Sequence, residues 1–223
     1  MNGAARYRQR AFPRPHVPQG VAVPQIVVLI PESTRKVKGG TTSPPSVDEI
    51  AGSLPAADRA KLHSLREEVS RGSPRGSIKS GGVLPAYRRF DGNMYRHIAA
   101  DAWAARSPHV EVLIASGLRG LLASRDTVPA YDHSMAESTP PFGKLNRWWH
   151  SRGLPGILAA YLTAVRPEAV VDLLSLEYRE SVAGYADGLR GIDVRTIDFP
   201  GMGRGSQPLR GEHVTRILRS GEP

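Results

Sequence analysis

The sequence predicts an α/β (α+β) fold, a single domain in which a mixed, mostly buried β-sheet is flanked by helices. Continuous apolar runs such as 25–30 (QIVVLI) have the length and β-branched content of strands that are buried on both faces. Segments with helical spacing of apolar residues separate these runs. Small and polar residues follow the runs, as they do where α/β proteins form ligand sites at the carboxyl ends of strands.

Four apolar runs are the predicted strands, at 25–30, 110–114, 170–174 and 194–199. Pro31 ends the first run and begins a polar, basic loop that extends to Gly40. The second run is followed by Ser116, Gly117 and a polar loop as far as Met135. We expect the loops after these strands to converge on one cleft, because the carboxyl ends of parallel strands meet at one edge of a sheet.

Helical spacing predicts helices between the strands. They are one or two helices over 48–69 with Ser53 and Asp58 as candidate caps, one that follows 86–95 toward Trp103, one over 145–165 interrupted by Gly153 and Pro155, and a basic one over 212–219. The segment 71–82 (RGSPRGSIKSGG) is predicted to be a flexible basic loop, because it is rich in glycine, serine and proline.

The composition, with 223 residues of which 40% are hydrophobic and 23% charged, is typical of a globular protein. No apolar run approaches the roughly 18 residues that span a bilayer, and the first 20 residues lack the apolar segment of a secretory signal. We therefore expect a cytoplasmic protein without a membrane partner. Residues 1–24 contain four prolines and four arginines, which predicts a disordered basic arm before a domain at 25–223.

The net charge of +9 predicts attraction to phosphate groups. Two kinds of partner have this chemistry: a phosphate-bearing small molecule, such as a nucleotide or nucleoside, and nucleic acid bound without sequence specificity. The absence of cysteine excludes disulfides, thiol catalysis and thiolate-bound metals. His133 and Glu137 have helical i, i+4 spacing but no third ligand, so we expect no metal site. No cofactor is predicted.

Five short blocks in order along residues 25–205 can be compared with known families. They are the first strand and its loop with Lys36; 90–95 (FDGNMY); Ser116-Gly117-Leu118 with Gly120, Asp126, Tyr131 and Met135; Ser175 with Glu177 and Tyr178; and Arg204-Gly205. Together these blocks resemble the YaaA family, known as bacterial peroxide-stress proteins. The resemblance implies the α/β fold of that family and a shared pocket formed by the blocks.

The sequence also departs from the family pattern. Arg119 stands where the family usually has an aromatic residue, Ala123 where it has an arginine, and Asp132 where an arginine is common. Some members carry a helix-hairpin-helix element, implicated in DNA binding, in the segment that corresponds to 60–85. We find no such hairpin here, so the resemblance supports the shared pocket more than it supports DNA binding.

Two residues are candidate catalytic groups. Glu177 follows the third predicted strand, where partial burial would raise the pKa of a carboxyl and suit it to general acid or base catalysis. The alternative is a helix cap or a partner of an arginine, which is also our interpretation of the nearby Asp172. Lys36 could bind a phosphate or polarise a leaving group, whereas the alternative is a solvated loop lysine.

The candidate substrate-binding residues come from the same blocks. Tyrosines could stack on a base or simply complete the edge of the core, small residues let the backbone approach a ligand, and basic residues could bind a phosphate. The set comprises Arg89, Asp91, Tyr95, Ser116, Gly117, Tyr131, Asp132, Tyr178 and Arg204.

These features favour an enzyme that acts on a nucleotide or nucleoside, as a hydrolase of the N-glycosidic bond with an acidic residue in a basic, tyrosine-lined pocket. The alternative is a nucleic-acid-binding protein of the peroxide-stress type without catalysis. In that case the arm, the 71–82 loop and the C-terminal arginines (Arg210, Arg216 and Arg219) would contact phosphates. A third hypothesis is an interaction module that docks through its arm.

Overall fold

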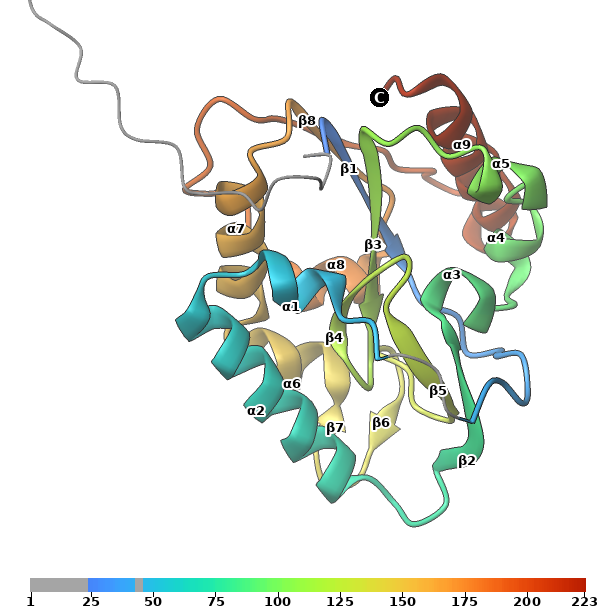
Figure 1. Cartoon of the computed structure of the whole chain (residues 1–223), viewed down its shortest axis with the longest axis vertical. Coiled ribbons are helices and arrows are strands. Elements are labelled where there is room, and N and C mark those ends of the chain that lie inside the picture. The colour runs from blue at the N-terminus through green and yellow to red at the C-terminus, as the bar shows by residue number, and fades with distance from the viewer. Residues whose placement is uncertain (1–23, 43–45) are drawn as a thin grey trace, which may run out of the picture.

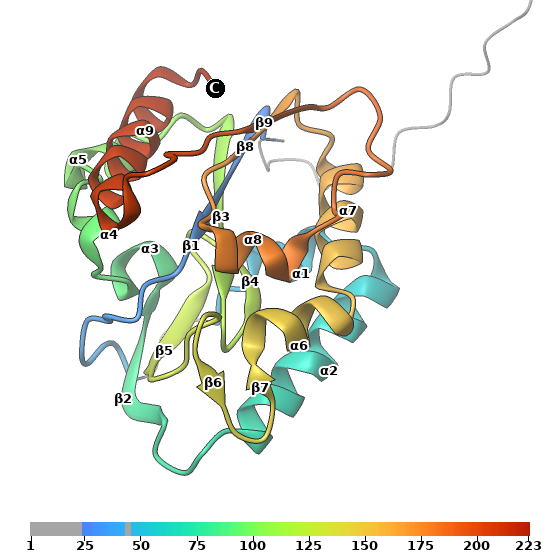
Figure 2. The same ribbon diagram turned by 180° about the vertical axis from the view of Figure 1, so that it is seen from behind.

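A five-stranded mixed sheet forms the centre of the computed structural model, which describes residues 24–42 and 46–223. The predicted arm at 1–24 lies outside these residues, apart from Pro24. The strand order is β4-β3-β1-β8-β9 (Figures 1 and 2). Neighbours are parallel among β1 (Ile26–Pro31), β3 (Val110–Ser116), β8 (Ala169–Asp172) and β9 (Asp193–Thr196), whereas β4 (Gly120–Ala123) is antiparallel to β3. The predicted mixed sheet is confirmed.

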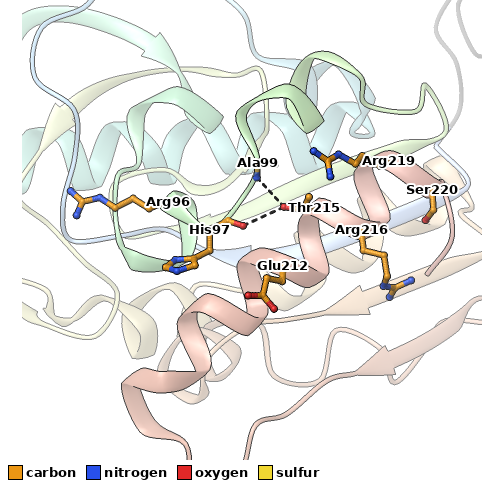
Figure 3. A pocket seen from close by; sticks show the side chains of 8 residues that line it. All are labelled: Arg96, His97, Ala99, Glu212, Thr215, Arg216, Arg219 and Ser220. Carbon is orange, nitrogen blue, oxygen red and sulfur yellow. Dashed lines mark hydrogen bonds between the residues drawn. The ribbon is translucent and has the colours of Figure 1, made fainter.

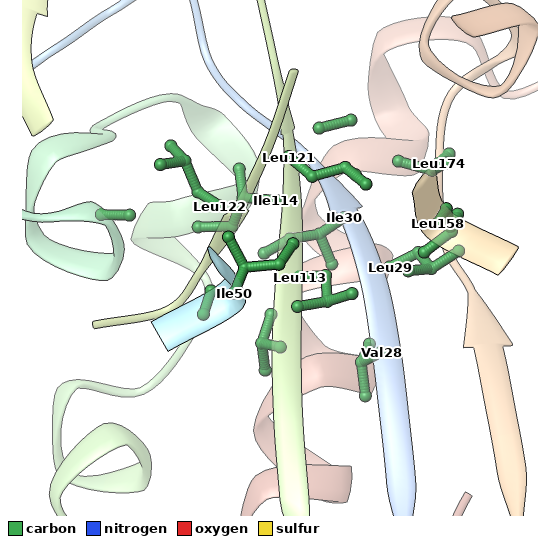
Figure 4. Close-up of a cluster of buried hydrophobic side chains, with 14 of the residues drawn as sticks. Val28, Leu29, Ile30, Ile50, Leu113, Ile114, Leu121, Leu122, Leu158 and Leu174 are labelled. Atoms are coloured by element: carbon green, nitrogen blue, oxygen red, sulfur yellow. The ribbon is translucent and has the colours of Figure 1, made fainter. Parts of the chain in front are cut away.

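The inner strands are buried because almost all of their side chains are apolar. Every residue of β1 is buried, and Leu29 pairs with Leu113 on one side and Asp172 on the other. Figure 4 shows leucines and isoleucines of β1, β3 and β4 packed near Ile50 of α1 and Leu158 of α7. Burial of each such side chain contributes about 1.5–3 kcal/mol, so this cluster is a main source of the stability of the sheet.

Helices lie on two sides of the sheet. Figures 1 and 2 both show α4, α5 and α9 together on one side and α1, α2, α6 and α7 on the other. The bounds of the first group are α4 (Asn93–Arg96), α5 (Ala100–Ala104) and α9 (Ser206–Ser220). Those of the second are α1 (Glu49–Ser53), α2 (Ala56–Gly72), α6 (Leu145–Ser151) and α7 (Leu154–Val165), and α8 (Leu176–Val182) packs against α6 and α7. The prediction of a sheet flanked by helices is confirmed.

Two small antiparallel pairs accompany the main sheet. They are β2 (Ile78–Pro85) with β5 (Thr127–Tyr131), and β6 (Ser138–Thr139) with β7 (Gly143–Lys144). The register of the first pair shifts between Ile78 and Val83, where the glycines of β2 form an irregularity. β5 continues the chain after the β3–β4 hairpin and returns Tyr131 to the carboxyl end of β3.

Two segments predicted as loops are largely strands. In 71–82, α2 extends to Gly72 and β2 begins at Ile78, because the β2 backbone pairs with β5. The stretch that follows 116 contains β4 and β5 instead of one polar loop. Leu121, Leu122 and Val128 are buried there, and the burial of these side chains stabilises the two strands. Because polar residues surround them in the sequence, the local pattern indicated a loop.

The helix boundaries also differ from the prediction. The side chain of Asp48 caps α1 by accepting from the Ala51 N–H at 3.3 Å, and α2 begins directly after Pro55. The predicted caps Ser53 and Asp58 are wrong, because both lie inside helices. Three short helices, α3 (Ala86–Arg89), α4 and α5, replace the single one predicted toward Trp103. The break between α6 and α7 at Gly153, where φ is +89°, is confirmed.

Across the described ranges 24–42 and 46–223, none of the helices combines the length and apolarity required to cross a membrane. α2 is followed directly by β2, so the segment 60–85 holds no helix-hairpin-helix element, as the sequence predicted.

Candidate functional site

The adjacent carboxyl ends of β1 and β3 bring Glu32 next to Ser116 and Gly117. The two strands pair in parallel with Pro31 opposite Ala115, and the Glu32 N–H continues the ladder by donating to the Ala115 carbonyl at 2.9 Å. Glu32 is only 4% exposed. β1 therefore delivers a carboxyl group into the interior at the edge where α/β sheets form ligand sites.

Two donors hold the Glu32 carboxyl. The Gly117 N–H donates to Oε1 at 2.7 Å, and the Tyr131 hydroxyl donates to Oε2. A Cβ atom at position 117 would lie 3.1 Å from Oε1 and 3.0 Å from the carbonyl carbon of Ser134. Glycine therefore lets the backbone approach the carboxyl group, which explains why this predicted binding residue is a glycine.

Lys36 places its amino group in the same cluster. Nζ lies 3.9 Å from Glu32 Oε2 and donates to the carbonyls of Ser33 at 2.9 Å and His133 at 3.1 Å. The centroid of the Tyr131 ring lies 4.0 Å from Nζ. These neighbours are acceptors or a π-face, a setting that suits an ammonium. The side chain is only 4% exposed, so Lys36 is not a solvated loop lysine.

Burial and mutual attraction act in opposite directions on this pair. Loss of hydration raises the pKa of Glu32, and the nearby Lys36 ammonium and Tyr131 hydroxyl oppose that rise. Loss of hydration also lowers the pKa of Lys36, against the attraction of Glu32. The ion pair and the neutral pair are therefore closer in free energy than they are in water.

A row of hydroxyl groups connects Glu32 to the turn after β3. The oxygens of Ser116 and Tyr131 lie 2.7 Å apart, and Ser116 Oγ also accepts from the Arg119 N–H at 3.2 Å. Since Tyr131 gives its proton to Glu32, the Ser116 hydroxyl donates to Tyr131. Burial raises the pKa of Tyr131 well above its usual value, so its hydroxyl stays protonated. The row therefore fixes the Tyr131 hydroxyl as a donor to Glu32.

The other two predicted tyrosines are also buried near this cluster. Tyr95 donates to the Pro31 carbonyl at 2.9 Å, and Tyr178 is buried at the start of α8. Each is 7% exposed, and burial together with the charge of Glu32 raises the pKa of both. In this conformation they support the segments around Glu32 and offer no free face to a base.

Glu177 is exposed and not desolvated, which corrects the expectation of a partly buried carboxyl. Its side chain accepts from the Ser175 hydroxyl at 3.4 Å, and its main-chain carbonyl accepts from Asn146 Nδ2 at 3.1 Å. It lies in the first turn of α8, where a negative charge is favourable. Its catalytic role stays a prediction.

Arg89 is fully buried and binds main-chain carbonyls. Nε donates to Val128 at 3.1 Å, Nη1 to Val37, and Nη2 to Gly39 at 2.9 Å and to Gly82 at 3.1 Å. The guanidinium thereby joins the loop after β1 to β2 and β5. In this conformation its nitrogens are occupied by the protein itself, so the structure offers a ligand no free face of Arg89.

The remaining predicted binding residues lie outside the cluster. Asp91 forms ion pairs with Arg35 at 3.2 Å and with Arg96 at 3.0 Å. Asp132 is exposed and paired with Lys79. Arg204 is exposed in the short 3-10 turn η1 (Gly203–Gly205) before α9. The structure therefore brings together Lys36, Tyr95, Ser116, Gly117, Tyr131 and Tyr178, whereas Asp91, Asp132 and Arg204 make contacts of their own.

Asp172 has the structural role that we expected. Oδ1 accepts from the Leu174 N–H at 2.9 Å, and Oδ2 pairs with Arg179 at 3.3 Å. Arg179 also pairs with Asp198 at 2.8 Å and donates to the Leu174 carbonyl at 3.0 Å. The end of β8 is thus fixed to the start of α8.

His133 takes part in hydrogen bonds with two serines. Its Nε2 lies 2.6 Å from Ser73 Oγ and 3.4 Å from Ser77 Oγ, and both hydroxyls donate to main-chain carbonyls. Nε2 is therefore the protonated nitrogen, and neither serine is activated as a nucleophile. Within the described part of the chain, no group of three or more histidine, aspartate or glutamate side chains could hold a metal ion.

A hollow of about 610 Å³ lies apart from the Glu32 cluster, over α4 and α9 (Figure 3). Arginines and a histidine line it, with Glu212 as the acidic member: Arg96, His97, Arg216 and Arg219. Thr215 in its floor accepts from the Ala99 N–H at 3.0 Å and donates to the His97 carbonyl at 3.3 Å, so it ties α9 to the segment after α4.

The fold and the cluster define an α/β protein with an acid, a lysine and a tyrosine gathered at the carboxyl edge of its parallel strands. Residues 48–209 match the family model described as peroxide stress protein YaaA, and the chain belongs to this family. The chain is similar to UPF0246 protein SCO2297 of Streptomyces coelicolor, with 27% identity over 186 residues, which is 72% of this chain and 66% of that protein. It thus spans about two thirds of the length of this relative. The matched segment 48–209 begins after β1, Glu32 and Lys36.

Sequence reasoning missed Glu32. Its signal was present, because a glutamate that directly follows a strand buried on both faces is delivered to the edge where ligand sites form. The polar context of 31–40 suggested a solvated loop instead. In the structure Glu32 is buried together with Tyr131 and Tyr178, which come from segments distant in the sequence. The residues next to Glu32 in the sequence therefore did not indicate that it is buried.

Proposed function

We propose that this chain is an acid–base enzyme that acts on a nucleotide or nucleoside and hydrolyses its N-glycosidic bond, with Glu32 as the proton donor. The observation that carries the proposal is the burial of Glu32 against Lys36, Tyr131 and the Gly117 N–H. Burial raises the pKa of the Glu32 carboxyl, which suits it to hold a proton closer to neutral pH.

Hydrolysis of an N-glycosidic bond needs a proton for the leaving base and water for the sugar. In the closed cluster Glu32 accepts at both oxygens and faces Lys36, so the proton would be taken up from solvent when the cluster opens to admit the substrate. Protonated Glu32 would then give this proton to the base nitrogen as the bond to C1′ breaks, and the bonding electron pair would leave with the base. Solvent would return a proton to Glu32 as the products leave, because Ser116 is fully buried and its other partner is only a main-chain N–H. Water would add to C1′ and release a proton, for which the exposed Glu177 carboxylate is the candidate acceptor.

A substrate can reach Glu32 only if the cluster opens. Glu32, Ser116 and Tyr131 are each less than 5% exposed, so a base could reach Glu32 only after the side chains above it move apart. Water is excluded from the closed cluster, which strengthens the electrostatic effect of Lys36 on a developing charge.

The decisive experiment follows release of the free base from a panel of nucleosides and nucleotides by chromatography. We expect turnover by the native chain and a loss of about 10²–10⁴-fold in Glu32→Gln, because an amide cannot donate the proton. Glu168→Gln is the matched control. Glu168 is an exposed glutamate at the amino end of β8, whereas Glu32 lies at the carboxyl end of the neighbouring parallel strand β1. Undiminished turnover in Glu32→Gln, or no turnover by the native chain on the whole panel, would contradict the proposal.

One observation favours nucleic-acid binding as a second candidate function. The hollow over α4 and α9 gathers arginines, and among them Arg216 forms no ion pair within the described residues (Figure 3). Mobility shifts with duplex and single-stranded oligonucleotides across a salt series test it. Binding that persists at physiological salt and is weakened by Arg216→Gln supports this function, whereas binding that vanishes as salt rises indicates charge attraction alone.

A further inference from the structure

A second hollow, of about 450 Å³, lies where α1, α2 and the turn between β3 and β4 meet. Basic side chains dominate its lining: Arg66 and Arg71 from α2, Arg119 from the turn, and His63. Asp48 and Glu67 are its acidic members. The lining of this hollow includes no member of the Glu32 cluster, so it is a separate feature of the surface.

Arg66 and Asp48 neutralise each other in the wall of the hollow. Nη1 of Arg66 donates to Asp48 Oδ2 at 2.7 Å, while Nε and Nη2 donate to the carbonyls of Arg119 at 3.0 Å and Leu121 at 2.7 Å. Each nitrogen of this guanidinium therefore has an acceptor. Arg66 fixes the β3–β4 turn against α2, and its charge is already compensated.

Arg119 is the opposite case. Its side chain forms no ion pair with any described residue, and its Nε is a buried donor without an acceptor. Buried guanidinium donors in proteins are nearly always paired, because an unpaired one loses its hydration without compensation. Its main chain is held by the Ser116 Oγ and by Arg66, so the guanidinium is presented to the hollow from a fixed turn.

The charge of Arg119 is only partly compensated by the more distant acids Asp48 and Asp126. Burial and the neighbouring Arg66 lower the pKa of Arg119, so both disfavour its charged form. Arg71, on the exposed rim, has a single side-chain hydrogen bond, from Nε to the Glu67 carbonyl at 3.4 Å, and no ion pair within the described residues. An anion in the hollow would supply a counter-charge to the Arg119 guanidinium, which lines it, and would meet Arg71 as a second cation at the rim.

We infer that this hollow is a binding site for the phosphoryl group of a small molecule, with the guanidinium of Arg119 as its principal ligand. A planar guanidinium presents parallel N–H donors that match two phosphoryl oxygens, and such charge-assisted bonds are stronger than neutral ones. Ser70 lines the same hollow and supplies a hydroxyl of suitable chemistry. The site does not depend on Glu32 being catalytic.

Calorimetric titration of the full chain with inorganic phosphate and with pyrophosphate tests the site. We expect the native chain to bind pyrophosphate more tightly than phosphate, and Arg119→Gln to weaken both by about tenfold or more. The affinity of Arg119→Lys should lie between those of the native chain and Arg119→Gln, because lysine keeps the positive charge but lacks the parallel N–H donors of the guanidinium. The matched control is Arg190→Gln, since Arg190 is an exposed arginine outside the hollow that forms no ion pair within the described residues.

The outcomes are distinct. Equal affinity of the native chain and Arg119→Gln, or no binding of either anion by the native chain, overturns the site, as does binding of oligonucleotides alone. Should Arg119→Gln melt at a lower temperature, Arg119→Lys and Arg71→Gln take its place, each with an expected weakening of a few fold. Glu32→Gln should bind pyrophosphate like the native chain, so failure of the catalytic proposal and failure of this site can be told apart.

Discussion

Two buried carboxyl groups lie at the carboxyl ends of neighbouring parallel strands, and their surroundings differ. Asp172 at the end of β8 pairs with Arg179, whose side chain is 23% exposed and which also pairs with Asp198. Glu32 after β1 pairs with Lys36, whose side chain is 4% exposed. Arg179 thus remains in contact with water and with a second acid, Asp198. Lys36 and Glu32, in contrast, are both buried near Tyr131 and Tyr178. The two acids are thus alike in their own burial and differ in the exposure of the cation that each one faces.

The largest expected effect is that of removing the buried cation. Lys36→Met should cost about 3–5 kcal/mol in the free energy of unfolding, because it leaves Glu32 without its counter-charge. Arg179→Met should cost less, about 1–3 kcal/mol, since Asp172 keeps the Leu174 N–H. Urea denaturation of both variants measures this difference. The double variant Glu32→Gln with Lys36→Met should recover most of the free energy of unfolding that Lys36→Met loses. If Arg179→Met costs more than Lys36→Met, the proposed difference between the two pairs is wrong.

A third buried carboxyl sharpens the comparison through its pH dependence. Asp126 has no cation within ion-pair distance among the described residues, and burial raises its pKa to about 7. Because the pKa is higher in the folded chain than the usual 3.9, its contribution to stability is fully present below about pH 4 and is lost as pH rises through about 7. Asp126→Asn should flatten the decline in stability across this window by about 1 kcal/mol or more. An NMR titration that finds Asp126 ionised at pH 5 would contradict the expectation.

The smallest effect on stability belongs to Glu177. Glu177→Gln should change the free energy of unfolding by less than about 0.5 kcal/mol, because an exposed side chain leaves no buried donor unpaired. Thermal denaturation and the base-release assay on the same protein separate its two interpretations. Lost turnover with an unchanged melting temperature supports the predicted catalytic role, and unchanged turnover removes Glu177 from the site.

The sheet could be predicted because β1, β3 and β8 are continuous apolar runs, a pattern that is visible in the local sequence. β2 and β5 escaped prediction, since each is stabilised by the other across a separation that local polarity does not reveal. In the site, Lys36, Ser116, Gly117 and Tyr131 were named and lie together. Glu32 was not, because its burial is produced by tertiary packing, and Arg89 was named for a ligand although its nitrogens are occupied by main-chain carbonyls.

The enclosure of Arg89 has an electrostatic consequence for the Glu32 cluster. Carbonyl dipoles replace its hydration shell, yet no described carboxylate pairs with it, so its full positive charge persists inside the protein. That charge lowers the pKa of Lys36. Because arginine stays protonated at all ordinary pH values, Arg89 favours the neutral form of Lys36 whatever the pH of the solution.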